Sequence, residues 1–208
     1  MSVRSCGALK TIRRARIFRQ QMVEIIFAYS ILIGFFLLET FLRQGTPARS
    51  FEKTESDRNS TYLIGLTFFV ILILSIILNL LKIGTFRNKL LALSGLIIMG
   101  VGLIIRIYSM LTLNKFYTRT LILTDAHELV KTGLYRYIRH PGYLGTILIW
   151  CACGLAMQNK IIFVAAIILI SIAYYYRIEN EEKMMTEKFG QGYLEYKKHS
   201  WRLLPFLW

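Results

Sequence analysis

The sequence predicts an all-α, polytopic membrane protein, with about five transmembrane helices in a bundle that ends in a helical hairpin. First, 55% of the 208 residues are hydrophobic, more than a soluble fold of this size carries. Second, the basic residues behind the formal net charge of +14 lie between apolar runs, as in membrane proteins, so we expect no nucleic-acid partner. Third, apolar runs recur along the chain, at 23–42, 61–81, 90–113, 142–157 and 161–176.

The chain begins with a basic N-terminal arm over residues 1–22, ahead of three predicted spans within 23–113. The arm has no acidic residue. This pattern favours a basic flank of the first span, with a membrane-surface arm or a transit-like leader as alternatives. A cleaved secretory signal is disfavoured because the following apolar run is too long. The basic residues of the arm are Arg4, Lys10, Arg13, Arg14, Arg16 and Arg19.

The last two apolar runs are shorter than the first three. A hydrocarbon core about 30 Å thick requires about 20 helical residues, which the first three runs supply. Only the segment 157–160 joins the last two runs, and so short a link predicts an antiparallel helical hairpin. The polar stretches on either side of the hairpin, 114–141 and 177–208, should therefore lie on the same side of the membrane.

The distribution of basic residues predicts which side that is. With five spans, the side of the two polar stretches also carries the 43–60 loop and holds the larger number of lysines and arginines, which predicts the cytosol. The basic N-terminus then lies on the far side, against the same rule. The expected location is the inner membrane of a prokaryotic cell or the endoplasmic reticulum of a eukaryotic one.

Four side chains within the apolar runs need an explanation. Glu39 can reach the membrane interface from a helix end, and Arg106 can either snorkel or face a polar cavity. Cys151 and Cys153 lie one residue apart and point to different faces of a helix. They fit neither a disulfide nor a zinc site, so we interpret them as apolar packing residues and expect no metal.

The polar stretch 126–143 has a pattern that ordinary connecting loops lack. Pro141 biases His140 away from helical geometry and suits the first turn of the next helix. The start of that helix offers free backbone N–H groups and a positive dipole end, which favour an anionic group such as a carboxylate. A membrane-interface belt would explain the tyrosines and arginines, but not the His-Pro-Gly-Tyr sequence together with a second histidine, His127.

A second polar stretch follows the hairpin. Arg177 and Glu181 are four residues apart and share a helix face, whereas Glu182 points away from it. The pair is either an exposed salt bridge of little energetic value or the second wall of a site shared with the first polar stretch.

Four spaced motifs resemble the isoprenylcysteine carboxyl methyltransferases and their prokaryotic relatives, and more distantly the phospholipid N-methyltransferases. The resemblance covers about residues 110–208 and is specific, because the motifs agree in order. They are H-x-L-V-x-x-G-x-Y-R-Y-x-R-H-P-x-Y-x-G at 127–145, R-I-x-x-E-E at 177–182, F-G-x-x-Y-x-x-Y at 189–196 and R-x-x-P at 202–205.

The resemblance implies a membrane enzyme that moves a methyl group from S-adenosylmethionine to the carboxylate of a prenylcysteine-like or other lipophilic substrate. Residues 114–208 would be the catalytic region, composed of a cofactor loop, the hairpin and a C-terminal helix. Arg177 would bind the substrate carboxylate and act as the catalytic residue, with Arg139 and Glu182 as further site candidates. The implied cofactor-binding residues are His127, Glu128, Leu129, Val130, Tyr135, His140, Pro141, Gly142, Tyr143 and Glu181.

Three other functions remain open from the sequence. Methylation of a phospholipid or lipid amine would use the same cofactor. A reductase with a nicotinamide cofactor would keep the fold and change the chemistry. A non-catalytic membrane scaffold would use its tyrosines and arginines as anchors in membrane lipid, but an anchor explains neither the paired histidines nor the second motif.

Overall fold

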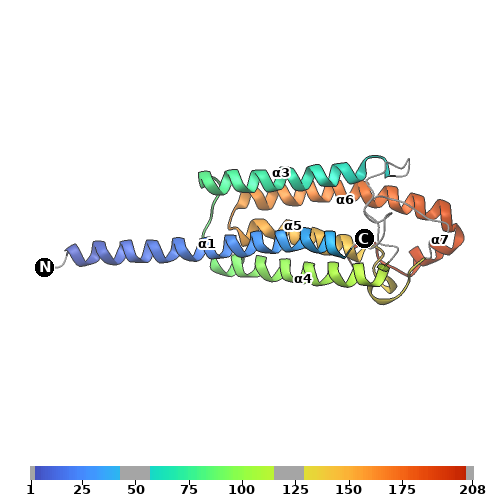
Figure 1. Cartoon of the computed structure of the whole chain (residues 1–208), viewed down its shortest axis with the longest axis horizontal. Helices are drawn as coiled ribbons and strands as arrows, with labels where there is room; N and C mark the ends of the chain where they lie inside the picture. The colour runs from blue at the N-terminus through green and yellow to red at the C-terminus, as the bar shows by residue number, and fades with distance from the viewer. Residues whose placement is uncertain (1–2, 43–56, 115–128, 205–208) are drawn as a thin grey trace.

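The computed structural model describes residues 3–42, 57–114 and 129–204, and over these ranges every regular element is a helix (Figure 1). This architecture confirms the predicted all-α class. The elements are α1 (Val3–Phe41), α3 (Ser60–Leu81), α4 (Lys89–Leu113), the 3-10 helix η3 (Gly133–Arg136), α5 (Pro141–Ala156), α6 (Lys160–Phe189) and α7 (Gln191–Lys198).

Four segments in the described part of the chain are long and apolar enough to cross a membrane. They are Arg19–Phe41 within α1, all of α3, all of α4 and α6. The fifth predicted span, α5, is apolar but has only 16 residues. Large apolar side chains also cover the outside of the bundle, as Leu80, Leu90 and Phe41 illustrate with exposed fractions of at least 75%. The chain is an integral membrane protein, because lipid accepts such a surface and water does not.

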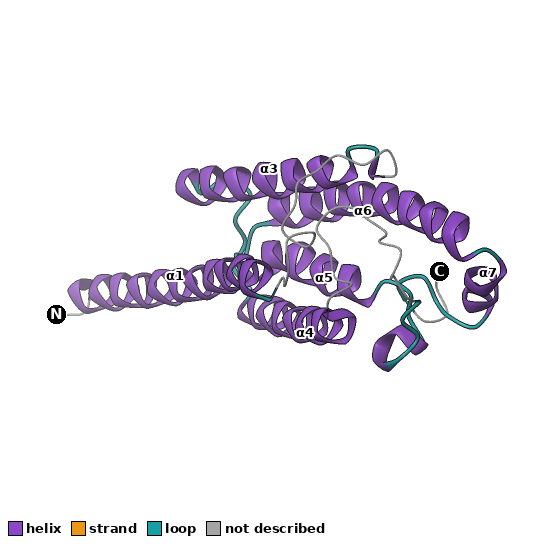
Figure 2. Cartoon of the chain, turned by 45° about the vertical axis from the view of Figure 1, so that its right-hand side comes forward, coloured by secondary structure: helices purple, strands orange, loops and turns teal. Residues whose placement is uncertain are grey.

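Helices α5 and α6 form the predicted hairpin and run antiparallel side by side (Figures 1 and 2). Asn159 begins α6: its side-chain oxygen accepts hydrogen bonds from the backbone N–H groups of Ile161 and Ile162. The same side chain donates to the carbonyl of Ile83 at 2.9 Å, and so joins the hairpin turn to the α3–α4 turn. Both turns therefore lie at one end of the bundle, and the polar elements η3 and α7 lie at the other.

Glycines allow α4 and α5 to pack closely along their length. A Cβ atom on Gly102 would lie 2.6 Å from the carbonyl oxygen of Gly145, and a Cβ atom on Gly145 would lie 2.6 Å from that of Gly102. Small residues at a helix crossing let the two backbones approach, which is how packing is gained where lipid removes the hydrophobic driving force. This contact fixes the first turn of α5 against α4.

An aromatic cluster fills the centre of the bundle. Trp150 of α5 is fully buried and stacks on Phe68 of α3, with ring centroids 4.4 Å apart and an interplanar angle of 3°. Phe35 of α1 meets both rings edge-on. Offset stacking and edge-on contacts are the favoured arrangements of aromatic rings. The cluster holds α1 and α3 against the hairpin, whose polar end carries the predicted site residues.

Candidate active site

The loop before α5 is held in place by the C-terminal segment, which we define as residues 191–204 and which includes α7. The backbone N–H of Arg139 donates to the carbonyl of Trp201 at 2.7 Å, and that of His140 donates to the carbonyl of Arg202 at 3.2 Å. His140 is the N-cap residue of α5 and Pro141 follows it in the first turn, as the sequence predicted. The loop and the C-terminal segment thus form one rigid edge beside the start of α5.

A chain of hydrogen bonds joins α5 to α6 at this edge. The Nε atom of Arg177 donates to the Tyr143 hydroxyl at 3.1 Å, and this hydroxyl donates to Glu181 Oε2 at 2.5 Å. Arg177 is 3% exposed, whereas the Glu181 side chain is 25% exposed. The structure therefore brings these three predicted site residues together, with a buried cation at one end and an accessible carboxylate at the other.

His140 packs beside the same chain. Its ring lies parallel to that of Tyr143, with centroids 5.4 Å apart. Its Nδ1 atom lies 3.7 Å from Glu181 Oε2, and its Nε2 atom lies 3.3 Å from Glu182 Oε1. The histidine thus fixes the angle of the tyrosine ring and separates the two carboxylates.

Arg177 has further partners, which sequence reasoning missed. Its Nη1 atom donates to Asp57 Oδ1, to Ser60 Oγ at 2.8 Å and to Thr61 Oγ1 at 2.9 Å. Burial opposes the charge of Asp57, but the Arg177 guanidinium and hydrogen bonds from Thr61 and Ser60 lower the pKa of its carboxyl overall. An acid just before the start of a span is favoured by the helix dipole, and this is the signal that could have singled out Asp57, two residues before the N-cap residue Asn59.

Glu182 ties three segments of the chain together, rather than facing the Arg177 side of α6. It is buried, and it accepts hydrogen bonds from Arg139 Nε and Arg202 Nη2, each at 2.8 Å. Lys197 Nζ lies 2.9 Å from the same carboxylate. The further candidates Arg139 and Glu182 therefore bind each other, and their described contacts join the loop, α6 and the C-terminal segment.

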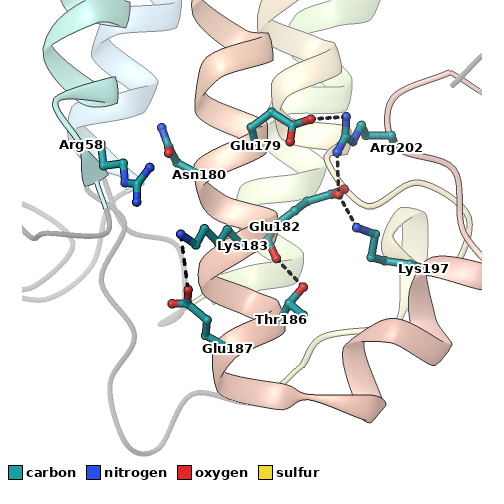
Figure 3. Close-up of a pocket in the computed structure, with 9 residues that line it drawn as sticks. All are labelled: Arg58, Glu179, Asn180, Glu182, Lys183, Thr186, Glu187, Lys197 and Arg202. Atoms are coloured by element: carbon teal, nitrogen blue, oxygen red, sulfur yellow. Dashed lines mark hydrogen bonds and ion pairs between the residues drawn. The ribbon is translucent and has the colours of Figure 1, made fainter.

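A pocket of about 510 Å³ opens beside this cluster (Figure 3). Of the predicted site residues, Glu182 lines it, and the close-up shows Arg202 and Lys197 reaching this carboxylate from the C-terminal segment. Cations and carboxylates alternate along its walls, so neither sign of charge dominates the pocket. Its lining residues are Arg58, Glu179, Asn180, Glu182, Lys183, Thr186, Glu187, Lys197 and Arg202.

The other predicted cofactor residues lie in the loop or at the start of α5. Leu129 and Val130 are half-buried ahead of η3. Tyr135 is buried, and its carbonyl accepts a 2.5 Å hydrogen bond from the Tyr196 hydroxyl, whose pKa burial raises to about 12. Pro141 is buried as well. Two further predicted residues, His127 and Glu128, lie outside the described residues.

Gly142 connects the site to a buried ion pair. Its carbonyl accepts from Arg106 Nη1 at 2.9 Å, and the Nη2 atom of Arg106 lies 2.6 Å from Glu39 Oε1. Both side chains of the pair are less than 10% exposed, so the protein encloses both charges. A charge buried in lipid needs such a partner. The pair links α1 and α4 to the first turn of α5.

Comparison with known proteins confirms the resemblance found in the sequence. Residues 93–187 match the model of the isoprenylcysteine carboxyl methyltransferase (ICMT) family. A protein-S-isoprenylcysteine O-methyltransferase of Dictyostelium discoideum is 33% identical over 119 residues, which cover 53% of this chain and 48% of that protein. The Homo sapiens protein of the same name is 30% identical over 119 residues, covering 56% and 42%. The chain spans about half the length of the curated relatives it matches.

A solved structure agrees with the fold. The eukaryotic intramembrane Ras methyltransferase ICMT superposes with a TM-score of 0.59 at 24% identity, covering 92% of this chain and 67% of that one. The helical arrangement is thus shared well beyond the matched segment, since α1 and α3 precede residue 93.

Proposed function

Because residues 93–187 match the ICMT family, we propose that this chain is a membrane methyltransferase that uses S-adenosylmethionine to methylate the carboxylate of a prenylcysteine-like or other lipophilic substrate. The observation that carries the proposal is the hydrogen-bonded chain from Arg177 through Tyr143 to Glu181. It offers a cation for a substrate carboxylate and a carboxylate for an ammonium group within one connected unit.

The residues around Glu181 fit the methyl donor. The amino acid part of S-adenosylmethionine carries an ammonium group, and the partly exposed Glu181 carboxylate is a suitable partner for it. The start of α5 at Pro141 also presents the positive end of its helix dipole, which would favour the donor's carboxylate. When bound there, the donor would supply an electrophilic methyl group on a sulfonium sulfur.

Arg177 would orient the acceptor. A terminal carboxylate has a pKa of about 3.3–3.7, so it is ionised at neutral pH and no general base is required. The chemical demand is alignment, which a buried guanidinium held by Tyr143 provides without paying for side-chain ordering during the reaction. Tyr143 contacts Arg177 and Glu181 alike, and so would set the spacing between acceptor and donor.

The proposal extends to the setting of the reaction. The site would face the cytosol, with residues 114–208 as the catalytic region and the spans before them as its membrane scaffold. Lipophilic substrate and membrane lipids would reach it from the bilayer.

Two measurements test the proposal on the full chain purified in detergent. S-adenosylhomocysteine should raise the melting temperature, and labelled methyl from S-adenosylmethionine should appear on N-acetyl-S-farnesylcysteine as a base-labile ester. Absence of both effects in a folded sample would overturn the proposal and favour the scaffold alternative. A base-stable methyl product on lipid amines would instead identify an N-methyltransferase, and a retained nicotinamide cofactor would identify a reductase.

A further inference from the structure

The guanidinium that would bind the acceptor already holds a carboxylate of this chain. Asp57 lies before α3, outside the family-matched segment 93–187, yet its Oδ1 atom accepts a hydrogen bond from Arg177 Nη1. The two residues are 2% and 3% exposed. Asp57 is far from the motifs in the sequence, yet it binds Nη1 of Arg177, the predicted substrate-binding residue.

Asp57 is held firmly where it is. The Ser60 hydroxyl donates to Oδ1 at 3.1 Å, and Thr61 donates from its hydroxyl at 2.9 Å to Oδ1 and from its backbone N–H at 3.3 Å to Oδ2. These bonds attach the carboxylate to the first turn of α3. The carboxylate therefore has partners of its own on α3, separate from its contact with Arg177.

This contact changes what Arg177 can offer to a ligand. Arg177 Nη1 has two N–H bonds. It already faces three acceptors, which are the carboxylate of Asp57 and the hydroxyls of Ser60 and Thr61. The Asp57–Arg177 pair is also electrically neutral, so a second carboxylate that approaches it gains little attraction and meets the like charge of Asp57. An acceptor must overcome both effects.

We infer that Asp57 is an internal competitor for the acceptor: its carboxylate occupies the Arg177 guanidinium until the carboxylate of a lipophilic substrate displaces it. Asp57 thereby sets the affinity for the acceptor and rejects weakly bound carboxylates. The inference rests on the proposed function. It leaves the donor side unchanged, because Arg177 binds Tyr143 through a different nitrogen, Nε, and Glu181 is bound to Tyr143.

A competitor role and a structural role of Asp57 predict opposite changes in acceptor affinity when its charge is removed. If Asp57 only held Arg177 in place, removal of its charge would loosen the arginine and weaken acceptor binding. If Asp57 competes, removal of its charge leaves a buried guanidinium that lacks this counter-charge, and acceptor binding becomes tighter. A buried ion pair is by itself weak evidence for either role.

The test compares Asp57→Asn and Asp57→Ser with wild type, since both variants remove the charge and keep a polar side-chain oxygen. The probes are N-acetyl-S-farnesylcysteine and its primary amide, with saturating S-adenosylhomocysteine and the full chain in detergent. The Kd of the carboxylate probe should fall at least about fivefold in both variants, since the like charge is gone. The Kd of the amide and that of S-adenosylhomocysteine should stay unchanged.

Two controls separate charge from packing. Ser60→Ala removes a neutral contact of the same nitrogen, and Glu195→Gln removes an exposed carboxylate on α7. Because Ser60 also donates to Asp57, Ser60→Ala should lower the Kd of the carboxylate probe less than Asp57→Asn does, and Glu195→Gln should not change it. Tightening in Ser60→Ala equal to that in Asp57→Asn would overturn the inference, and so would an unchanged or higher Kd in both Asp57 variants.

Failure of the inference differs from failure of the proposed function. If wild type binds the carboxylate probe and methylates it, but the Asp57 variants bind it no more tightly, only the competitor role is wrong. If neither wild type nor variants bind any probe or S-adenosylhomocysteine, both proposals are wrong. Binding of the carboxylate probe by the Asp57 variants but not by wild type would support the competitor role directly.

Discussion

Arg177 is the residue on which the proposed chemistry depends most. Its guanidinium donates from Nε to Tyr143 and from Nη1 to Asp57, so its planar fork is held on two sides. A lysine would keep the charge but could not span both partners, because an ammonium group is a single point. The geometry, more than the charge, is what a substitution at this position would remove.

We therefore expect Arg177→Lys to lower kcat/KM for methyl transfer on the order of 100-fold, as misplacement of a reacting group by about 1 Å does. The measurement is steady-state transfer to N-acetyl-S-farnesylcysteine. Arg87→Lys is the matched control, since it makes the same change at an exposed position in the α3–α4 turn, at the opposite end of the bundle. Equal activity of Arg177→Lys and wild type would contradict the assignment of Arg177 to the acceptor.

The pKa of Asp57 gives stability a pH dependence. Because the folded state lowers this pKa below its ordinary value of 3.8, the charge of Asp57 stabilises the fold above that value, and the contribution is lost as the pH falls through the folded-state pKa. Asp57→Asn lacks this contribution at every pH. The difference in melting temperature between wild type and Asp57→Asn should therefore be largest near neutral pH and shrink below pH 4. A difference that stays constant into the acid range would show that the native carboxyl is not held in its charged form.

At the scale of single elements, close helix packing positions the site. Gly102 and Gly145 let α4 and α5 touch, and α5 begins with the residues that present Gly142 and Tyr143 to the site. The hydrophobic runs predicted both helices, but the runs carry no information about which helices touch.

Gly102→Val should destabilise the protein by about 2 kcal/mol or more, because its Cβ would collide with the backbone of α5, and overpacking costs about 1–3 kcal/mol. Gly100→Val in the same helix is the control, since a Cβ atom there has no neighbour within 4 Å. Denaturation of both variants in detergent measures the difference. Equal stability of the two variants would refute the close packing of α4 on α5.

At the scale of the whole molecule, an ion pair ties the first span to the site. Glu39 of α1 binds Arg106 of α4, and Arg106 also donates to the carbonyl of Gly142 at the start of α5. Three elements far apart in the sequence thus meet at one guanidinium. Helix α1 therefore helps to position the candidate site, although it lies outside the family match, which begins at residue 93.

Glu39→Gln should lower stability by about 3 kcal/mol, because it leaves Arg106 buried with less counter-charge. The double variant Glu39→Gln with Arg106→Met removes both charges and should recover part of this loss, which a double-mutant cycle measures. The two substitutions would instead be simply additive if the residues did not interact. Binding of S-adenosylhomocysteine, measured in parallel, shows whether the pair also supports the donor side of the site.

The sequence by itself determined the membrane class and the helical hairpin, and it singled out as candidates Arg177, Tyr143 and Glu181, which the structure brings together. Apolar runs of sufficient length require helices in lipid, and a short link between two of them permits only an antiparallel pair. The spacing of Arg177 and Glu181 likewise fixed their common face, since it depends only on helix geometry.

Tertiary structure alone decided which partners these residues have. The contact of Asp57 with Arg177, the pairing of Glu39 with Arg106 and the gathering of cations around Glu182 all join segments far apart in the chain. Periodicity describes which way a side chain faces on its own helix. The side chain it meets depends on how helices pack and in which register, and this is set by many contacts at once rather than by any local pattern.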